Sequence, residues 1–185
     1  MMKKVTRYPL SVILLHWLVA VALIGNLFIG LMLDDHENLI ALHKSIGILI
    51  LGLAAVRLAN RLRARHMLPR SINAVGTAAR FAEKAVHHVL YVLMVAIPLL
   101  GWMKTNAAGH AARFFGFFSL PIIVQQSRDL SKWLGELHSL AAYGLAALVG
   151  LHVLGALTHW ALKSKNVLPR ILPSLRRGSG ADDAF

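Results

Sequence analysis

The chain has 185 residues, of which 57% are hydrophobic and only 15% charged, and its 20 Lys and Arg residues outnumber its 8 Asp and Glu residues, for a formal net charge of +12. Since about 25% of the residues in a typical soluble domain are charged, this chain has too little polar surface to cover a soluble globule. It contains no Cys, which excludes disulfide scaffolds, thiolate metal sites, Fe–S clusters and cysteine nucleophiles.

Four apolar stretches are long enough to cross a bilayer, which takes about 20 residues. They cover residues 10–33, 39–62, 85–103 and 133–162. The first stretch has the basic flank of a signal peptide. It is too long for a signal core, however, and it lacks a small-x-small cleavage site, so we expect it to remain as a helix. Pro98 interrupts the third stretch, where a transmembrane helix tolerates it as a kink.

These stretches predict an all-α integral membrane protein, with a four-transmembrane-helix, up-down-up-down bundle over residues 1–165 and a cytoplasmic tail over residues 166–185. Fifteen of the 20 Lys and Arg residues lie in the N-terminal segment, in the C-terminal segment, or between Arg57 and the third helix. The positive-inside rule therefore predicts that both termini are cytoplasmic. Topology thus explains the basic excess, and no nucleic-acid-binding motif is visible.

The connection over residues 105–132, expected on the outer side, is long and contains the run Phe-Phe-Gly-Phe-Phe at 114–118. Such a run is too apolar to sit freely in water. We expect it to lie in the membrane interface or to fold over the helix ends.

Two histidines share one face of the fourth predicted helix. His138 and His152 are fourteen residues apart, just under four helical turns, which places them about 21 Å apart along the axis. Ionisable residues within the membrane are costly and indicate function. Two haem irons stacked across a bilayer need ligands at about this spacing. The alternative is two unrelated histidines that form hydrogen bonds between helices.

Each iron then needs a second imidazole at a matching depth on another helix. His16 lies in the first turns of the first helix, at the depth of His152, and His43 lies near the start of the second, at the depth of His138. The predicted pairs are therefore His16 with His152 on the inner side and His43 with His138 on the outer side. Bis-imidazole iron suits electron transfer. A zinc site needs four ligands that converge at one point, which these two depths do not allow.

Two further histidines lie near the inner surface. His87 begins the third helix, and His159 follows His152 by seven residues on nearly the same face. Either can bind or protonate a quinone head group, because quinone reduction consumes protons and neutral His relays them. The alternative is interfacial histidines that form hydrogen bonds with solvent or lipid.

Basic residues also occur on the outer side, where few are expected. Lys44 adjoins His43, Lys132 precedes His138 by six residues, and Lys104 ends the third helix. Together they can form a positive funnel that steers a small anion towards the outer iron. The alternative is ordinary interfacial lysines that contact lipid phosphates.

The chain resembles the bacterial cytochrome b561 family over nearly its whole length. The order and spacing of several short segments together carry this resemblance. These are Leu15-His16-Trp17, Leu42-His43-Lys44-Ser45-Ile46-Gly47, Val56-Arg57-Leu58, His87 and Tyr91 through Pro98 and Gly101, Phe115-Gly116, Lys132-Trp133, Leu137-His138, and Gly150-Leu151-His152 through His159.

The resemblance implies a multi-pass inner-membrane cytochrome with two b haems, whose ligands fall on His16, His43, His138 and His152. The branch it most resembles is superoxide oxidase, which implies that superoxide donates electrons outside and ubiquinone accepts them inside. By this resemblance His87 and His159 lie on the quinone side, and Lys44, Lys104 and Lys132 serve the donor side.

Two other functions stay open at this point. One is an electron-transfer subunit that docks a dehydrogenase or a soluble redox carrier and exchanges electrons with the quinone pool. The other is a haem-free membrane bundle whose histidines only form hydrogen bonds, although no broken helices or in-membrane carboxylates support transport.

Overall fold

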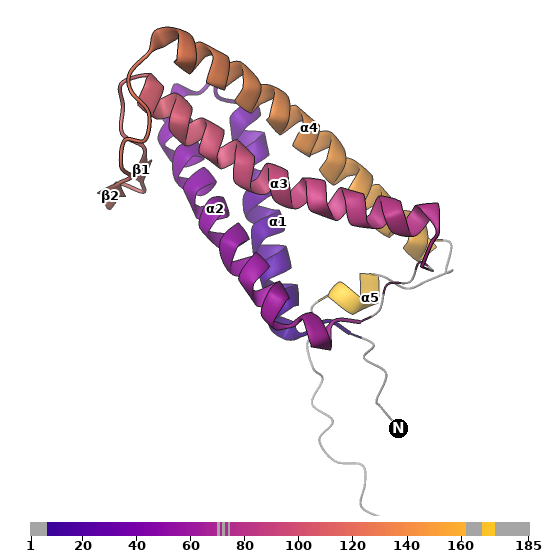
Figure 1. Ribbon diagram of the computed structural model, residues 1–185. Helices are drawn as coiled ribbons and strands as arrows, with labels where there is room; N and C mark the ends of the chain where they lie inside the picture. The colour runs from indigo at the N-terminus through magenta and orange to yellow at the C-terminus, as the bar shows by residue number, and fades with distance from the viewer. Residues whose placement is uncertain (1–6, 70, 72, 74, 162–167, 173–185) are drawn as a thin grey trace, which may run out of the picture.

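The computed structural model describes residues 7–69, 71, 73, 75–161 and 168–172. Among these residues, four helices are long and apolar enough to cross a membrane (Figure 1). They are α1 (Leu10–Leu31), α2 (Ile40–Arg63), α3 (Ala78–Ala107) and α4 (Arg128–Ala161). Short 3₁₀ turns at Glu37–Leu39 and Arg65–Met67, a small hairpin of β1 (Arg113–Phe114) and β2 (Phe118–Ser119), and α5 (Leu168–Ile171) complete the described elements. The predicted all-α, four-helix membrane fold is confirmed.

Helices α3 and α4 begin earlier than the apolar stretches predicted. The Thr77 hydroxyl accepts a hydrogen bond from the Arg80 backbone N–H at 3.3 Å, and the Ser127 hydroxyl accepts one from the Leu130 N–H at 3.3 Å. Each hydroxyl satisfies a donor that a helix start leaves unpaired. Polar first turns are therefore stable as helix, although hydropathy alone does not detect them.

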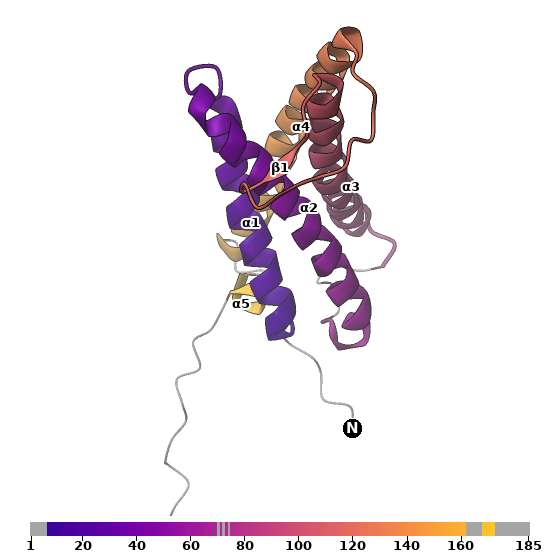
Figure 2. The same ribbon diagram turned by 90° about the vertical axis from the view of Figure 1, so that its left-hand side faces the viewer.

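The four long helices form two hairpins that cross at a marked angle (Figures 1 and 2). Helix α1 packs along α2, α3 packs along α4, and the two hairpins meet chiefly where α2 contacts α3. All four helices contribute to one small core, which includes Val19, Leu23, Ile50, Met94 and Leu145. This core holds the hairpins together near the middle of the bundle.

Large apolar side chains cover the outside of the bundle. Five of these side chains are each more than 60% exposed: Val21, Phe28, Val92, Leu140 and Leu151. Because exposed apolar area of this extent is unfavourable in water, these side chains fit a surface that contacts lipid. The helices thus bury few residues among themselves and turn most of their apolar surface outwards.

The hairpin of β1 and β2 lies against the start of α2 (Figure 1). Its strands are antiparallel, with Phe114 opposite Phe118, and the left-handed backbone of Phe115 and Gly116 turns the chain between them. The Ser45 hydroxyl accepts a hydrogen bond from the Phe115 N–H at 2.9 Å and donates one to the Ala41 carbonyl at 2.8 Å. The apolar run is therefore folded onto a helix end.

The C-terminal part of the described chain returns to the start of α1. The indole N–H of Trp17 donates a hydrogen bond to the carbonyl of Ile171 at 2.8 Å, which ties α5 to α1. Residues 168–172 are the described part of the predicted tail over residues 166–185, and the rest of that tail lies outside the described residues.

Candidate functional site

The predicted histidine partners lie together in the fold. The ring centroids of His16 on α1 and His152 on α4 are 6.4 Å apart, and those of His43 on α2 and His138 on α4 are 6.1 Å apart. Each pair therefore joins α4 to one helix of the other hairpin. We call these the inner pair (His16 and His152) and the outer pair (His43 and His138).

Both separations suit one metal ion held between two imidazoles. A metal–nitrogen bond is about 2.0 Å long and a ring centroid lies about 1.1 Å behind its nitrogen, so two rings on opposite sides of one ion have centroids about 6 Å apart. His87 also contacts His152, but their centroids are only 5.3 Å apart, too close for an ion that the two rings bind from opposite sides. The geometry thus favours His16 over His87 as the partner of His152.

Within the described residues, no group of three or more His, Cys, Asp or Glu side chains could hold a metal ion. A metal bound by one of these pairs must therefore take its other ligands from elsewhere. Haem iron does this, because the porphyrin supplies four nitrogens and leaves two axial positions for the protein. The pairs fit haem better than zinc, which takes four ligands at one point.

Glycines bring both outer-pair rings close to a neighbouring backbone. A Cβ on Gly101 would lie 3.2 Å from Cε1 of His138, and the His138 ring N–H at Nδ1 donates to the Ile97 carbonyl at 3.0 Å. A Cβ on Gly30 would likewise lie 3.2 Å from Cε1 of His43. The bond at Nδ1 of His138 leaves its Nε2 free to ligate a metal.

The inner pair has different neighbours. Nη2 of Arg57, on α2, lies 2.9 Å from Nδ1 of His16. The guanidinium carbons of Arg57 and Arg61 also lie 5.2 Å and 5.8 Å from the centroid of the Tyr91 ring. Two cationic side chains therefore stack on one tyrosine beside the inner pair.

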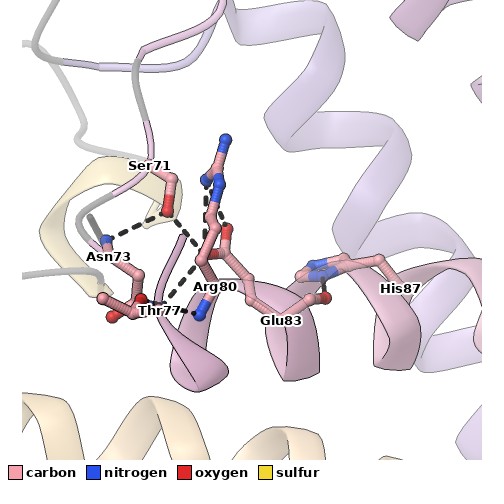
Figure 3. Close-up of polar contacts among 6 residues, drawn as sticks. All are labelled: Ser71, Asn73, Thr77, Arg80, Glu83 and His87. Atoms are coloured by element: carbon pink, nitrogen blue, oxygen red, sulfur yellow. Dashed lines mark hydrogen bonds and ion pairs between the residues drawn. The ribbon is translucent and has the colours of Figure 1, made fainter. Parts of the chain in front are cut away.

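His87, on α3, lies next to the inner pair, and a carbonyl one turn earlier in the same helix fixes its ring. Its Nδ1 hydrogen is donated to the Glu83 backbone carbonyl at 2.6 Å, while the Glu83 carboxylate accepts hydrogen bonds from Ser71, Asn73 and Arg80 (Figure 3). The ring of His87 thus presents Nε2 on the side away from Glu83. The side chain of His159 lies outside the described residues.

The predicted donor-side lysines, Lys44, Lys104 and Lys132, lie at the end of the bundle that carries the outer pair. Lys104 and Lys44 both act electrostatically on the His43 ring, and Lys104 acts on His138 as well. Lys104 and Lys132 line one hollow of about 830 Å³ together with Arg128. Lys104 therefore links the hollow to the outer pair.

Sequence reasoning did not find the glycine contacts. Gly30 and Gly101 lie against the imidazoles of His43 and His138. Each such glycine lies one helical turn after a carbonyl that a histidine of another helix approaches. This pattern can be recognised only when the neighbouring helix is known.

Known proteins resemble this chain over most of its length. Residues 7–174 match the family model described as prokaryotic cytochrome b561. The chain is 28% identical over 173 residues to cytochrome b561 homolog 2 of Escherichia coli (strain K12), which covers 90% of this chain and 91% of that protein. It is 30% identical over 135 residues to the probable superoxide oxidase CybB of Yersinia pestis, which covers 73% of this chain and 75% of that protein.

The family match extends over all four long helices, including those that carry the inner and outer pairs. The chain therefore belongs to the prokaryotic cytochrome b561 family, haem b-binding proteins of membrane electron transfer, and is a multi-pass protein of the bacterial inner membrane.

Proposed function

We propose that this chain is a superoxide:ubiquinone oxidoreductase with two haem b groups. The inner pair ligates one haem and the outer pair ligates the other. The observation that carries the proposal is the outer pair itself, a two-imidazole site with Lys44 and Lys104 acting on it and a basic hollow beside it. The likeness to a protein named probable superoxide oxidase supports the choice of donor.

The reaction balances with two superoxide anions for each quinone. Each superoxide gives up one electron and leaves as O₂, and the quinone takes two electrons and two protons to become the quinol. When bound, the haems would supply one-electron carriers, one held by each pair, and His138 and His152 of these pairs lie about 21 Å apart along α4. The chain's own task is to bring an anion to one end and a quinone with protons to the other.

At the outer end, the lysines attract and orient the anion. Superoxide carries one negative charge, and a positively lined hollow raises its local concentration and its rate of encounter. Lys104 and Lys132 line the hollow, and Lys44 adds its charge beside His43. Positive charge on the outer side of the membrane, where positive-inside topology disfavours it, thereby acquires a use.

At the inner end, His87 and His159 serve the quinone. The His87 ring contacts His152 at 5.3 Å between centroids, so a head group hydrogen-bonded to Nε2 of His87 would lie next to the inner pair. The hydrogen on Nδ1 of His87 is donated to the Glu83 carbonyl, so Nε2 must first take up a proton from water and can then donate it to the quinone oxygen. With both termini cytoplasmic, the protons come from the cytoplasmic side.

The test uses purified, haem-loaded protein with enzymatically generated superoxide and a soluble ubiquinone. The triple variant Lys44→Gln, Lys104→Gln and Lys132→Gln should reduce the quinone at least about tenfold more slowly at low ionic strength, and its rate should depend less on salt. A matched control removes three basic residues from the opposite end of the bundle: Arg63, Arg65 and Lys84. The control should behave as wild type.

Two results would overturn the proposal. Quinone reduction that persists after superoxide dismutase is added would show that superoxide is not the donor. A wild-type protein whose haems are not reduced by superoxide, but are reduced by a co-purified dehydrogenase or carrier, would instead establish the electron-transfer subunit. Equal rates in the triple variant and wild type would refute the role of the three lysines but would leave superoxide as the donor.

A further inference from the structure

The contact between Arg57 and His16 has a consequence for the inner site. Nη2 of Arg57 lies 2.9 Å from Nδ1 of His16, and a guanidinium can only donate hydrogen bonds. In this contact Nδ1 is therefore an acceptor, and the proton of the neutral imidazole sits on Nε2. His138 has the opposite arrangement, because its Nδ1 hydrogen is donated to a carbonyl.

Ligation of a metal reverses the roles of the two nitrogens of His16. A neutral imidazole that binds iron through Nε2 carries its hydrogen on Nδ1. Nδ1 then cannot accept from Arg57, and two donors would face each other. The guanidinium must therefore leave Nδ1 and find another acceptor when His16 is ligated.

The described protein offers Arg57 no carboxylate. The only ion pair among the described residues joins Arg80 to Glu83, and the Glu83 carboxylate is already bound by three donors (Figure 3). The other acidic residues of the described chain lie near the outer end of the bundle: Asp34, Asp35, Glu37, Asp129 and Glu136. Arg57 lies about 25 Å along α2 from Ile40, where the helix begins. It is therefore far from these acidic residues.

Arg57 is nevertheless held in place as if to meet an anion. It is partly buried, it stacks on Tyr91 at 5.2 Å, and Arg61 stacks on the same ring at 5.8 Å. Two like charges on one ring repel each other, and an anion between or beside them offsets this repulsion. A planar guanidinium matches a carboxylate in a two-pronged hydrogen bond.

We infer that Arg57 moves from Nδ1 of His16 to a propionate carboxylate of the inner haem and raises that haem's reduction potential. Arg61 adds a second positive charge at the same place. This inference rests on the proposed ligation by the inner pair. Arg57 is a positioning residue, and its positive charge favours the reduced, less positive iron.

The test measures the inner haem alone, in a His43→Ala background that lacks one ligand of the outer haem. Adding Arg57→Gln should lower the midpoint potential in a spectroelectrochemical titration and speed haem transfer to apomyoglobin about tenfold. Arg57→Lys keeps the charge without the two-pronged geometry. Its midpoint potential and haem-transfer rate should lie between those of the Arg57 protein and of Arg57→Gln. Arg65→Gln, an exposed arginine at the same end of the bundle, is the matched control and should leave both readouts unchanged.

A vibrational measurement tests the contact directly. Redox-induced infrared difference spectra with haem carrying ¹³C-labelled propionates should show carboxylate bands that shift between wild type and Arg57→Gln. Wild-type potential, dissociation rate and carboxylate bands in Arg57→Gln would overturn the inference. An effect of Arg57→Gln that appears in anionic-lipid nanodiscs and vanishes in phosphatidylcholine nanodiscs would also overturn it, because a lipid headgroup of net negative charge would then be the partner.

Two more variants test the role of Arg57 separately from the proposed ligation by the inner pair. Asp182→Asn with Asp183→Asn removes two carboxylates that lie outside the described residues, and a drop in potential equal to that of Arg57→Gln would assign the acceptor to the tail instead. His16→Ala should lose the inner haem. If His16→Ala keeps both haems, the ligand assignment fails. If it loses one while Arg57→Gln changes nothing, only the role of Arg57 fails.

Discussion

Adding a single methyl group at Gly101 should displace His138 without weakening the helix. The new Cβ would lie 3.2 Å from Cε1 and 3.3 Å from Nδ1 of the His138 ring, whereas carbon atoms pack best at about 3.5–4.0 Å. The ring must therefore retreat by several tenths of an ångström, which lengthens its 3.0 Å bond to the Ile97 carbonyl. Losing such a partner of a metal ligand costs about 10–100-fold in metal affinity.

Backbone energetics act in the opposite direction. Ala is about 1 kcal/mol more favourable than Gly inside a helix, so Gly101→Ala should leave the haem-free bundle as stable as wild type or slightly more stable. The lost hydrogen bond offsets about 1 kcal/mol of this gain at most. A fall in haem retention without a fall in bundle stability is therefore the signature of the ring displacement.

The assay is the ratio of haem to protein by pyridine haemochromogen, together with the rate of haem transfer to apomyoglobin. Gly101→Ala should lose the outer haem about ten to a hundred times faster than wild type and keep the inner one. Gly25→Ala is the control, because Gly25 is exposed and its Cβ would meet nothing within 4 Å. Wild-type retention in Gly101→Ala, or an equal loss in Gly25→Ala, would refute the reasoning.

Variants at Gly30, His43 and Ser45 test three other contacts. Gly30→Ala should also loosen the outer haem, since its Cβ would press on His43 at 3.2 Å, and the transfer assay measures it. His43→Ala should leave one b haem per chain, and a colourless wild type from haem-replete cells would contradict the ligand assignment. Ser45→Ala removes the 2.9 Å bond from the Phe115 N–H and should destabilise the hairpin by about 1 kcal/mol, seen as faster hydrogen exchange at residues 113–119 with unchanged haem content.

Much of the fold and the pairing of the histidines could be predicted from the sequence. Membrane spans depend on the length of apolar runs, and the depth of a residue in a span depends on its distance from the ends of the run. His138 and His152 share a face because fourteen residues is nearly a whole number of turns. Their approach to His43 and His16 therefore follows from the up-down order of the helices.

Contacts between helices could not be predicted in this way. Gly30 and Gly101 matter because a ring from another helix lies over them, and Arg57 reaches His16 from α2 to α1. Such contacts depend on the rotation of each helix about its axis and on the angle at which the hairpins cross. The early start of α3 escaped detection for another reason, since the Thr77 cap acts through hydrogen bonding and leaves no trace in hydropathy.

The crossing of the two hairpins links cofactor supply to the lifetime of the protein. Direct packing between the hairpins runs chiefly through α2 and α3, and α1 touches α4 only slightly. Under the proposed ligation, each haem joins α4 to α1 or α2, and a ligand that binds only the assembled state stabilises it by mass action. When haem synthesis is slow, newly inserted chains would keep their two hairpins but would lack the haem links between them. Membrane proteases would then remove them first, so the amount of cytochrome in the membrane would follow the haem available to the cell.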